Sequence, residues 1–434
     1  MIKFKNNLLV KNIIILLVSG ALAKVLGMVG KIIYTRTAGI NVVGLYTMIT
    51  PTLMLIISIT QFSFPISISK ISAEGKYKNN DLLKNAYIIG SAINVILILL
   101  VLFTSSLIAS MLHNKSLAPA IMSVIFIIPF ITISSIQRGF LHGKEDMLSA
   151  SITNVTEEIV KIVLIITLLP IAIAKDDITA VIFMILFNII TELTNIFIMR
   201  QSINKKYIPK EKGSLNIKII KEILSISTPT TAVRLISSLG FFLEPIILTN
   251  TLLESGFSSN YITLEYGVIN SYIIPLLSIP SFFSTSIASA LLPNITKAYA
   301  GKKYKEFNSK LLKLLLLSMV VGGLCLAVIL IFPEIILKLI YNVNFGINYI
   351  YLIGPFFLVL YMQPTLSIAL QAMGKTNKLF ITSTVSMILK YGVLYVFGKL
   401  GFGMNALIFS IITGIIVTTF LVTIIVLKEM NKKL

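Results

Sequence analysis

Long apolar runs separated by short, mostly basic segments fill this chain. The hydrocarbon core of a bilayer takes about 20 helical residues, so apolar runs of that length predict membrane-spanning helices. The pattern predicts twelve spans, at residues 8–33, 45–68, 86–111, 118–141, 150–174, 178–200, 219–249, 268–292, 311–332, 348–373, 379–398 and 404–427.

The composition leads to the same class of protein. The 434 residues are 56% hydrophobic and only 12% charged, which a soluble domain would carry only with large exposed apolar patches. We therefore expect an all-α polytopic membrane protein. The single cysteine, Cys325, lies in an apolar run and offers neither a disulfide framework nor a zinc cluster, so no metal or other cofactor is expected.

The basic residues are distributed unevenly between alternate loops. Among the 37 lysines and arginines, the few in the loops on one side are Arg36, Lys115, Lys175, Lys338 and Lys399. The positive-inside rule then puts both termini of a multi-pass cell-membrane protein in the cytoplasm. Topology and anionic lipid of the inner leaflet account for the net charge of +20, so membrane lipid is an expected partner and nucleic acid is not.

A weak internal repeat divides the chain into two halves. The sequence that begins Ile68-Ser69-Lys70 at the end of span two returns as Ile295-Thr296-Lys297 at the end of span eight. Six spans separate the two copies, which predicts parallel repeats about an axis along the membrane normal, with lobes at 1–212 and 213–434. The alternative is that helix ends at the inner surface simply favour glycine and lysine.

Six cations fall inside the predicted spans. Each costs about 2.5–3.5 kcal/mol at membrane depth, so each should face a protein interior or a water-filled cavity, and cations that line a cavity suggest an anionic passenger. Lys31 and Arg138 lie near span ends and are equally compatible with snorkelling to the surface. The six are Lys24, Lys31, Arg138, Lys161, Arg234 and Lys390.

Acidic residues in the spans are fewer. Glu157 and Lys161 are spaced for an i, i+4 ion pair, and either Glu157 or its neighbour Glu158 could point inward. Glu244, in span seven, is either a proton or sodium site or a counter-ion for the cations. Glu192 and Lys390 have no partner that the sequence identifies.

Lys24 and Lys31 are seven residues apart and share one helix face, which Arg36 extends toward the outer loop. We expect Lys24, Arg138 and Arg234 to contribute to one cavity. The sequence has neither a phosphate-binding loop nor a histidine near a nucleophile, so an enzyme is not expected.

Several short motifs, taken in order, resemble one family. The chain is similar to members of the multidrug/oligosaccharidyl-lipid/polysaccharide exporter superfamily, in its polysaccharide-biosynthesis branch. The residues that carry the resemblance are Lys24 to Gly30, Pro65 to Lys70, Pro129 with Arg138-Gly139 and Gly143, Glu157 to Lys161, and Pro275 to Pro293.

This resemblance implies two six-helix lobes that form a V around a cationic central cavity and work by alternating access. Arg138, Glu157 and Arg234 match positions of the family pattern. The chain departs from that pattern at Lys161, where arginine is usual, and at Ser63-Phe64, where Gly-Ile usually precedes the proline. Relatives of the MurJ type move the lipid-linked peptidoglycan precursor outward across the membrane.

Three functions follow as hypotheses. The first is a flippase for a lipid-linked anionic glycan, in which Lys24, Lys31, Arg36, Arg138, Glu157, Lys161, Arg234 and Glu244 form the substrate site. The second is a cation-coupled multidrug antiporter, and the third is a scaffold for cell-wall synthases. A coupling ion, H⁺ or Na⁺, stays open. Cations outnumber carboxylates within the spans, which favours the flippase.

Overall fold

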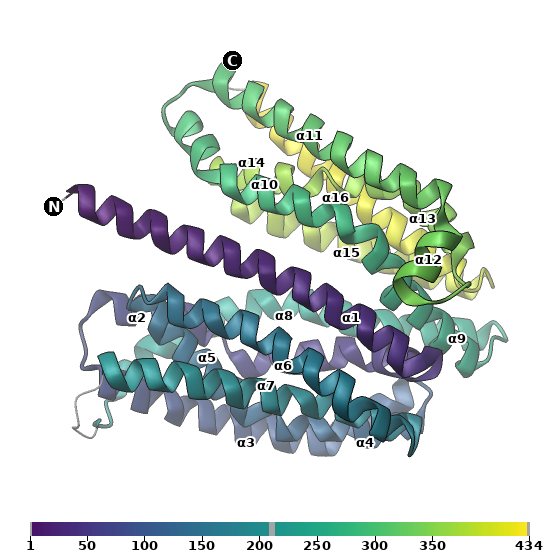
Figure 1. The fold of residues 1–434 in the computed structure, drawn as a ribbon, viewed down its shortest axis with the longest axis horizontal. Helices are drawn as coiled ribbons and strands as arrows, with labels where there is room; N and C mark the ends of the chain where they lie inside the picture. Colours follow the sequence, from purple (N-terminus) through teal and green to yellow (C-terminus); the bar gives the residue numbers. More distant parts are fainter. Residues whose placement is uncertain (1, 208–212, 432–434) are drawn as a thin grey trace. The chain divides into compact units, whose positions relative to one another are not determined.

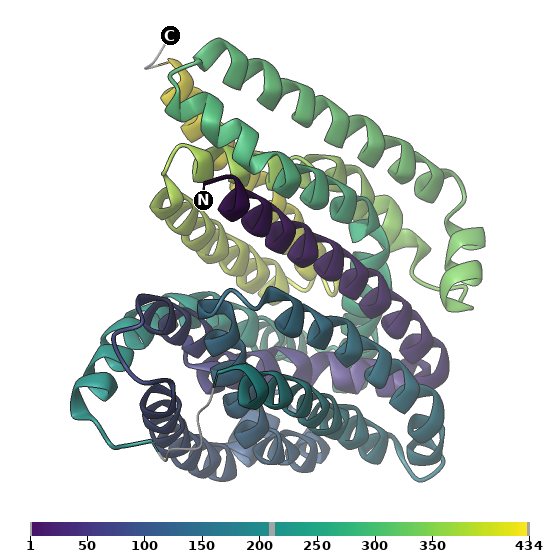
Figure 2. The same cartoon turned by 60° about the vertical axis from the view of Figure 1, so that its left-hand side comes forward.

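The computed structural model describes residues 2–207 and 213–431, and every regular element within these ranges is a helix. The chain separates into two units, Met1–Leu243 and Glu244–Leu434. The amino-terminal unit comprises α1 (Ile2–Gln61), α2 (Phe64–Glu74), α3 (Asn79–Met111), α4 (Ala118–Ser123), α5 (Ile128–Gly143), α6 (Met147–Ile173), α7 (Asp177–Lys206) and most of α8 (Ile217–Glu254). Helices α3, α5, α7 and α6 lie side by side in this unit (Figures 1 and 2).

The carboxy-terminal unit begins near the end of α8. Its remaining elements are α9 (Ser259–Gly267), a π-helical turn at Val268–Ile273, α10 (Ile274–Ala300), α11 (Tyr304–Ile331), α12 (Pro333–Tyr341), α13 (Ile347–Leu360), α14 (Gln363–Ala372), α15 (Thr376–Lys399) and α16 (Asn405–Asn431).

The described helices account for the twelve predicted spans. Nine helical stretches are long and apolar enough to cross a bilayer, and one of them, Val18–Glu74, holds two spans because the helix breaks at Gly39. The pair Lys115–Phe126 and Ile128–Gly143, bent by 41°, forms another span. The twelfth is α6, which has 27 residues and carries three charged side chains.

Four of the spans carry a proline in the first turn of an α-helix, directly after a segment that is not regular α-helix: a left-handed pair at Phe62 and Ser63, a 3₁₀ turn at Val124–Phe126, the π-helical turn at Val268–Ile273 and a turn at Tyr361 and Met362. Pro65, Pro129, Pro275 and Pro364 lie in the first turn of α2, α5, α10 and α14. Proline has no N–H, and the first turn of a helix is where that missing donor costs no helical hydrogen bond. These are the second and fourth spans of each half, as the weak sequence repeat would require.

Helix α8 continues across the boundary between the units. The expected lobes, 1–212 and 213–434, stay a prediction, since residues 208–212 lie outside the described ranges. The division observed in the structure falls later, at Leu243/Glu244, because the first part of α8 packs in the amino-terminal unit. Ser227 and Thr231 of α8, for example, bond to Ser67 and Ser63 of that unit.

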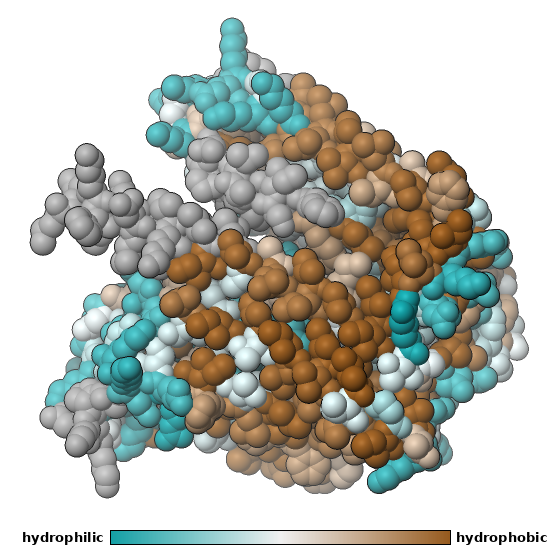
Figure 3. Space-filling view, in the orientation of Figure 1, coloured by the Kyte–Doolittle hydropathy of each residue, from teal (hydrophilic) through white to brown (hydrophobic). Residues whose placement is uncertain are grey.

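Exposed apolar side chains cover the outer faces of the amino-terminal unit. Figure 3 shows this apolar surface over α6 and α7, with hydrophilic residues toward the helix ends. Phe103 of α3 is 81% exposed and Phe197 of α7 is 64% exposed. Such exposure is unfavourable in water and is typical of surfaces that face lipid.

Glycines bring α5 close to α2 in the amino-terminal unit. A Cβ on Gly139 would lie 2.8 Å from the carbonyl oxygen of Phe64, and one on Gly143 would clash with the carbonyl oxygen of Ser69. Small residues four apart allow this kind of close helix packing in membranes. The contact fixes α5, and with it Arg138, against the broken second span.

Asp146 joins the start of α6 to the end of α7. Its carboxylate accepts hydrogen bonds from the backbone N–H of Ser149 at 3.3 Å, from Ser202 Oγ at 3.0 Å and from Lys206 Nζ at 2.7 Å. Burial alone would raise the pKa of the Asp146 carboxyl, but the bonds from Lys206, Ser149 and Ser202 outweigh burial and hold this pKa below its usual value.

We expect Asp146→Asn to lower the free energy of unfolding by about 1–2 kcal/mol, because a helix cap and its ion pair are weakened. A carboxyl whose pKa is lowered on folding stabilises the protein above its unfolded pKa, about 3.9, and loses that contribution as the pH falls through the lower folded pKa. Denaturant titrations between pH 3 and 7 measure how much of the free energy of unfolding is lost in acid. Asp176→Asn is the matched comparison and should lose less, because the pKa of Asp176 is also lowered by its cap bonds from Thr179 but its carboxylate makes no ion pair with a described residue.

Candidate functional site

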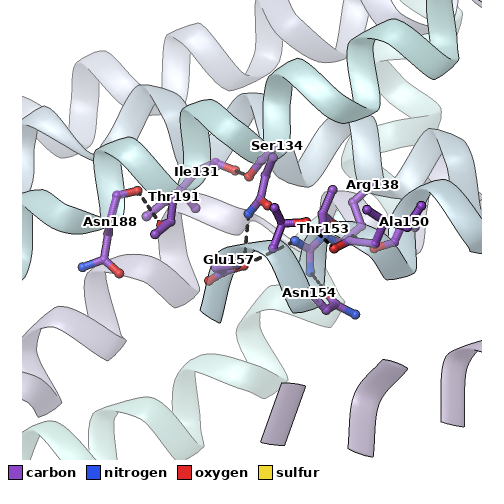
Figure 4. Close-up of polar contacts among 12 residues, drawn as sticks. Ile131, Ser134, Arg138, Ala150, Thr153, Asn154, Glu157, Asn188 and Thr191 are labelled. Carbon is purple, nitrogen blue, oxygen red and sulfur yellow. Dashed lines mark hydrogen bonds and ion pairs between the residues drawn. The ribbon is translucent and has the colours of Figure 1, made fainter. Parts of the chain in front are cut away.

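Arg138 is the centre of a polar group on α5, α6 and α7. Its Nη1 donates to Asn154 Oδ1 at 2.9 Å, and its Nη2 lies 3.8 Å from Glu157 Oε2. Asn195 Nδ2 donates to the same Glu157 oxygen at 3.0 Å. Figure 4 shows Arg138 together with Asn154 and Glu157. The side chains of Arg138 and Glu157 are 28% and 33% exposed. The ion pair is therefore loose and accessible from one side.

Several buried side-chain oxygens of α5, α6 and α7 lack a hydrogen-bond partner among the described residues. They are Glu192 Oε2, Asn195 Oδ1, Gln137 Oε1 and Ser151 Oγ. Buried polar atoms are normally satisfied by protein or by water. The unsatisfied oxygens of α5, α6 and α7 could therefore bind a proton, a cation or water.

The expected Glu157–Lys161 ion pair is not formed. Glu157 contacts Arg138 and Asn195 on neighbouring helices instead, because these side chains supply donors to its carboxylate. Glu158 faces α1, where Gly27 leaves room for it. A Cβ on Gly27 would lie 3.3 Å from the Glu158 carboxyl.

Two cations of α1 lie on either side of Gly27, where Glu158 contacts this helix. Lys24 and Lys31 stand three residues before and four after Gly27; Lys24 is exposed and Lys31 half-buried. Lys24 makes no ion pair with any described residue. Arg36 is exposed, three residues before the helix break at Gly39, where φ is 73°.

A row of hydroxyl contacts joins α8 to the broken second span. Ser227, Thr231 and Ser238 of α8 bond to the hydroxyls of Ser67, Ser63 and Ser58 at 2.7, 3.0 and 2.9 Å. Positions 227, 231, 234 and 238 share one helix face, so Arg234 belongs to the same row. We call this row the α8 seam.

Arg234 Nη2 donates to Gln61 Oε1 at 2.7 Å, and its side chain makes no other hydrogen bond or ion pair with a described residue. Gln61 is the last residue of α1. It precedes Phe62 and Ser63, whose φ values of 43° and 48° are left-handed and cost roughly 1–2 kcal/mol for each residue with a side chain. The α8 seam thus holds a strained break next to a guanidinium that has no carboxylate partner.

Glu244 belongs to the carboxy-terminal unit and is bonded there to Lys390 and Tyr266. Of the two sequence interpretations for Glu244, this geometry is that of a counter-ion, and it also supplies the partner that the sequence did not identify for Lys390. Whether Lys24, Arg138 and Arg234 line one cavity stays a prediction.

The sequence reasoning missed Gln61, Asn154, Asn195 and Tyr266. Gln61, Asn154 and Asn195 are polar side chains within predicted spans, which was the available signal, whereas Tyr266 lies just before the predicted eighth span. A neutral amide or phenol costs less than a charge in a membrane, so these residues do not stand out until their partners are known.

Twelve bilayer-crossing segments, all helical within the described residues, together with broken helices and intramembrane charges, are typical of a multi-pass membrane transport protein. The chain belongs to the family described as "Polysaccharide biosynthesis protein", whose profile matches residues 9–299. A second profile, MatE, matches residues 269–396. The superfamily expected from the motifs, and the membrane transporter class, are confirmed.

Curated relatives from Bacillus subtilis (strain 168) match nearly the whole chain. It is 28% identical to "Stage V sporulation protein B" over 424 residues, covering 95% of this chain and 82% of the relative. It is 25% identical to "Sporulation protein YkvU", with 95% and 94% covered.

Solved structures of multidrug resistance MATE family transporters share the fold. An inward-facing structure matches with a TM-score of 0.68 at 16% identity, covering 94% of both chains. An outward-facing structure matches with a TM-score of 0.58 at 16% identity, covering 98% of this chain and 96% of the other.

We expect Thr231→Val to lower the free energy of unfolding by about 0.6 kcal/mol, the mean value of an interhelical hydrogen bond in a membrane protein. The effect should be non-additive with that of Ser63→Ala, because both changes remove the same bond. Unfolding in mixed micelles by increasing SDS measures it. Thr230→Val is the matched control, since Thr230 bonds only to the carbonyl of Ile226 in its own helix. Simple additivity of the two changes would contradict the α8 seam.

Proposed function

We propose that the chain is a flippase that moves a lipid-linked anionic glycan outward across the cell membrane by alternating access. The observation that carries the proposal is that Arg234 and Lys24, both within crossing segments, have no carboxylate partner among the described residues. Uncompensated cations at membrane depth are costly. A substrate diphosphate would supply the missing negative charge.

The geometry of Arg234 suits a phosphate. One of its five N–H groups bonds to Gln61, which leaves the others for bidentate bonding to phosphate oxygens. Gln61 orients the guanidinium without neutralising it. Lys24 and Lys31, with Arg36 beyond them on α1, would add further positive charge along the path of the headgroup.

Arg138 is suited to exchange its partner. Its separation from Glu157, 3.8 Å, is long for a charge-assisted bond, whereas its bond to Asn154 is short. A phosphate could replace Glu157 at little cost. Lys161, which makes no ion pair with a described residue, is available to the released carboxylate one turn away on α6.

The family description and the sporulation relatives support a glycan substrate for this transporter class. A second candidate is a cation-coupled multidrug antiporter. It is favoured by the buried Glu192 Oε2, which has no hydrogen-bond partner among the described residues, by Glu158, which makes no ion pair with a described residue, and by the fold shared with the MATE transporters. In either case H⁺ or Na⁺ is the proposed coupling ion.

We expect Lys24→Gln and Arg234→Gln to reduce glycan transport or binding about ten- to a hundredfold each, since charge-assisted bonds are worth roughly 1.5–3 kcal/mol. Arg234→Lys should also be impaired, because an ammonium lacks the planar fork. The measurement is the accessibility of the glycan headgroup on the far side of reconstituted vesicles.

Arg200→Gln, at an exposed arginine near the end of α7, is the matched control and should transport normally. Unchanged transport by a folded Lys24→Gln/Arg234→Gln double variant would refute the assigned site. Efficient ion-driven efflux of a cationic dye by the unmodified protein would instead favour the antiporter.

A further inference from the structure

A carboxylate and an ammonium meet inside the carboxy-terminal unit. Lys390 of α15 donates to Glu244 Oε2, and the Tyr266 hydroxyl of α9 donates to Glu244 Oε1 at 3.3 Å. Glu244 is 5% exposed, Tyr266 is 3% exposed and the Lys390 side chain is 19% exposed. Both oxygens of the carboxylate are therefore engaged by groups of this chain.

The surroundings hold Lys390 in this position. Its Nζ lies 5.3 Å from the centre of the Tyr391 ring, a cation–π distance. Its aliphatic stem passes Gly414 of α16, where a Cβ would lie 3.5 Å from Lys390 Cδ. The charged and titratable groups that face Glu244 are thus Lys390, Tyr266 and Tyr391.

A carboxylate at membrane depth ordinarily binds a proton or a metal cation, or pairs with a fixed charge, because an isolated anion there is costly. The ammonium of Lys390 is also a monovalent cation, and it cannot dissociate because it is covalently part of the chain. We propose that Lys390 is the resident cation of a carboxylate site on α8, so that the carboxy-terminal unit takes up neither H⁺ nor Na⁺ at Glu244.

The amino-terminal unit differs in this respect. Glu158 has no ion pair within 4 Å among the described residues, and Glu192 Oε2 is buried without a partner. External cations would therefore have carboxylate oxygens available in that unit but not at Glu244. The inference goes beyond the proposed function, because it holds whether the passenger is a glycan or an organic cation.

The test removes the resident cation and asks whether an external one takes its place. Purified Lys390→Met in detergent is unfolded by heat in NaCl and in choline chloride at equal ionic strength, at pH 6 and pH 8. Choline is too bulky for the position. We expect Na⁺ or acid to raise the unfolding midpoint of this variant by on the order of 5 °C, as ligand binding to the folded state does.

Three further variants make the result specific. Lys390→Arg keeps the positive charge and should show no such response, like the unmodified protein. Lys390→Met/Glu244→Gln lacks the carboxylate and should lose the response. Lys310→Met removes an exposed lysine paired with Glu306, and should respond to neither Na⁺ nor acid in this way.

Two results overturn the inference. One is a Na⁺-specific stabilisation of the unmodified protein that Glu244→Gln abolishes, which would mean that Glu244 already binds an external cation. The other is the absence of any Na⁺ or acid response in Lys390→Met and in Lys390→Gln, including failure of both variants to fold in every buffer. Recovery of folded protein only in Na⁺ or in acid supports the inference.

Discussion

The hydrocarbon core of a bilayer has no water, so every polar group inside it must find its partner within the protein. This constraint explains why the interior contacts of the described chain are so often between polar side chains of different helices. Ser227 meets Ser67, Asn195 meets Glu157 and Lys390 meets Glu244. In each case the bond joins helices that apolar packing alone would leave free to slide, because lipid tails are as apolar as leucine.

The same constraint limits where a spanning helix can break. The second span is interrupted before Pro65, and the interruption frees backbone groups. In the second span the break at Phe62 and Ser63 lies against α8, and the Ser63 hydroxyl accepts a bond from Thr231. A broken helix next to Arg234 and Gln61 joins a strained backbone to a charged group, an arrangement found where transporters bind their substrates.

Charge is balanced differently in the two units. In the carboxy-terminal unit the intramembrane Glu244 is neutralised by Lys390, whereas in the amino-terminal unit Lys24 and Arg234 have no carboxylate partner among the described residues. Paired charges stabilise the fold but leave little net charge to attract a ligand. Unpaired charges are costly until a ligand of opposite charge binds, and this is the physical basis for the proposal that the passenger binds beside the amino-terminal cations.

The sequence by itself determined the membrane class, the twelve spans and the family, because hydrophobic run length and short motifs are local properties. It also identified Arg138, Arg234 and Glu244 as charges that need partners. Only the tertiary structure decided which partners they have. The i, i+4 spacing favoured Lys161 for Glu157, yet Glu157 turned to Arg138 and Asn195. Pairing across helices depends on how helices distant in sequence pack together, and a one-dimensional pattern does not contain that information.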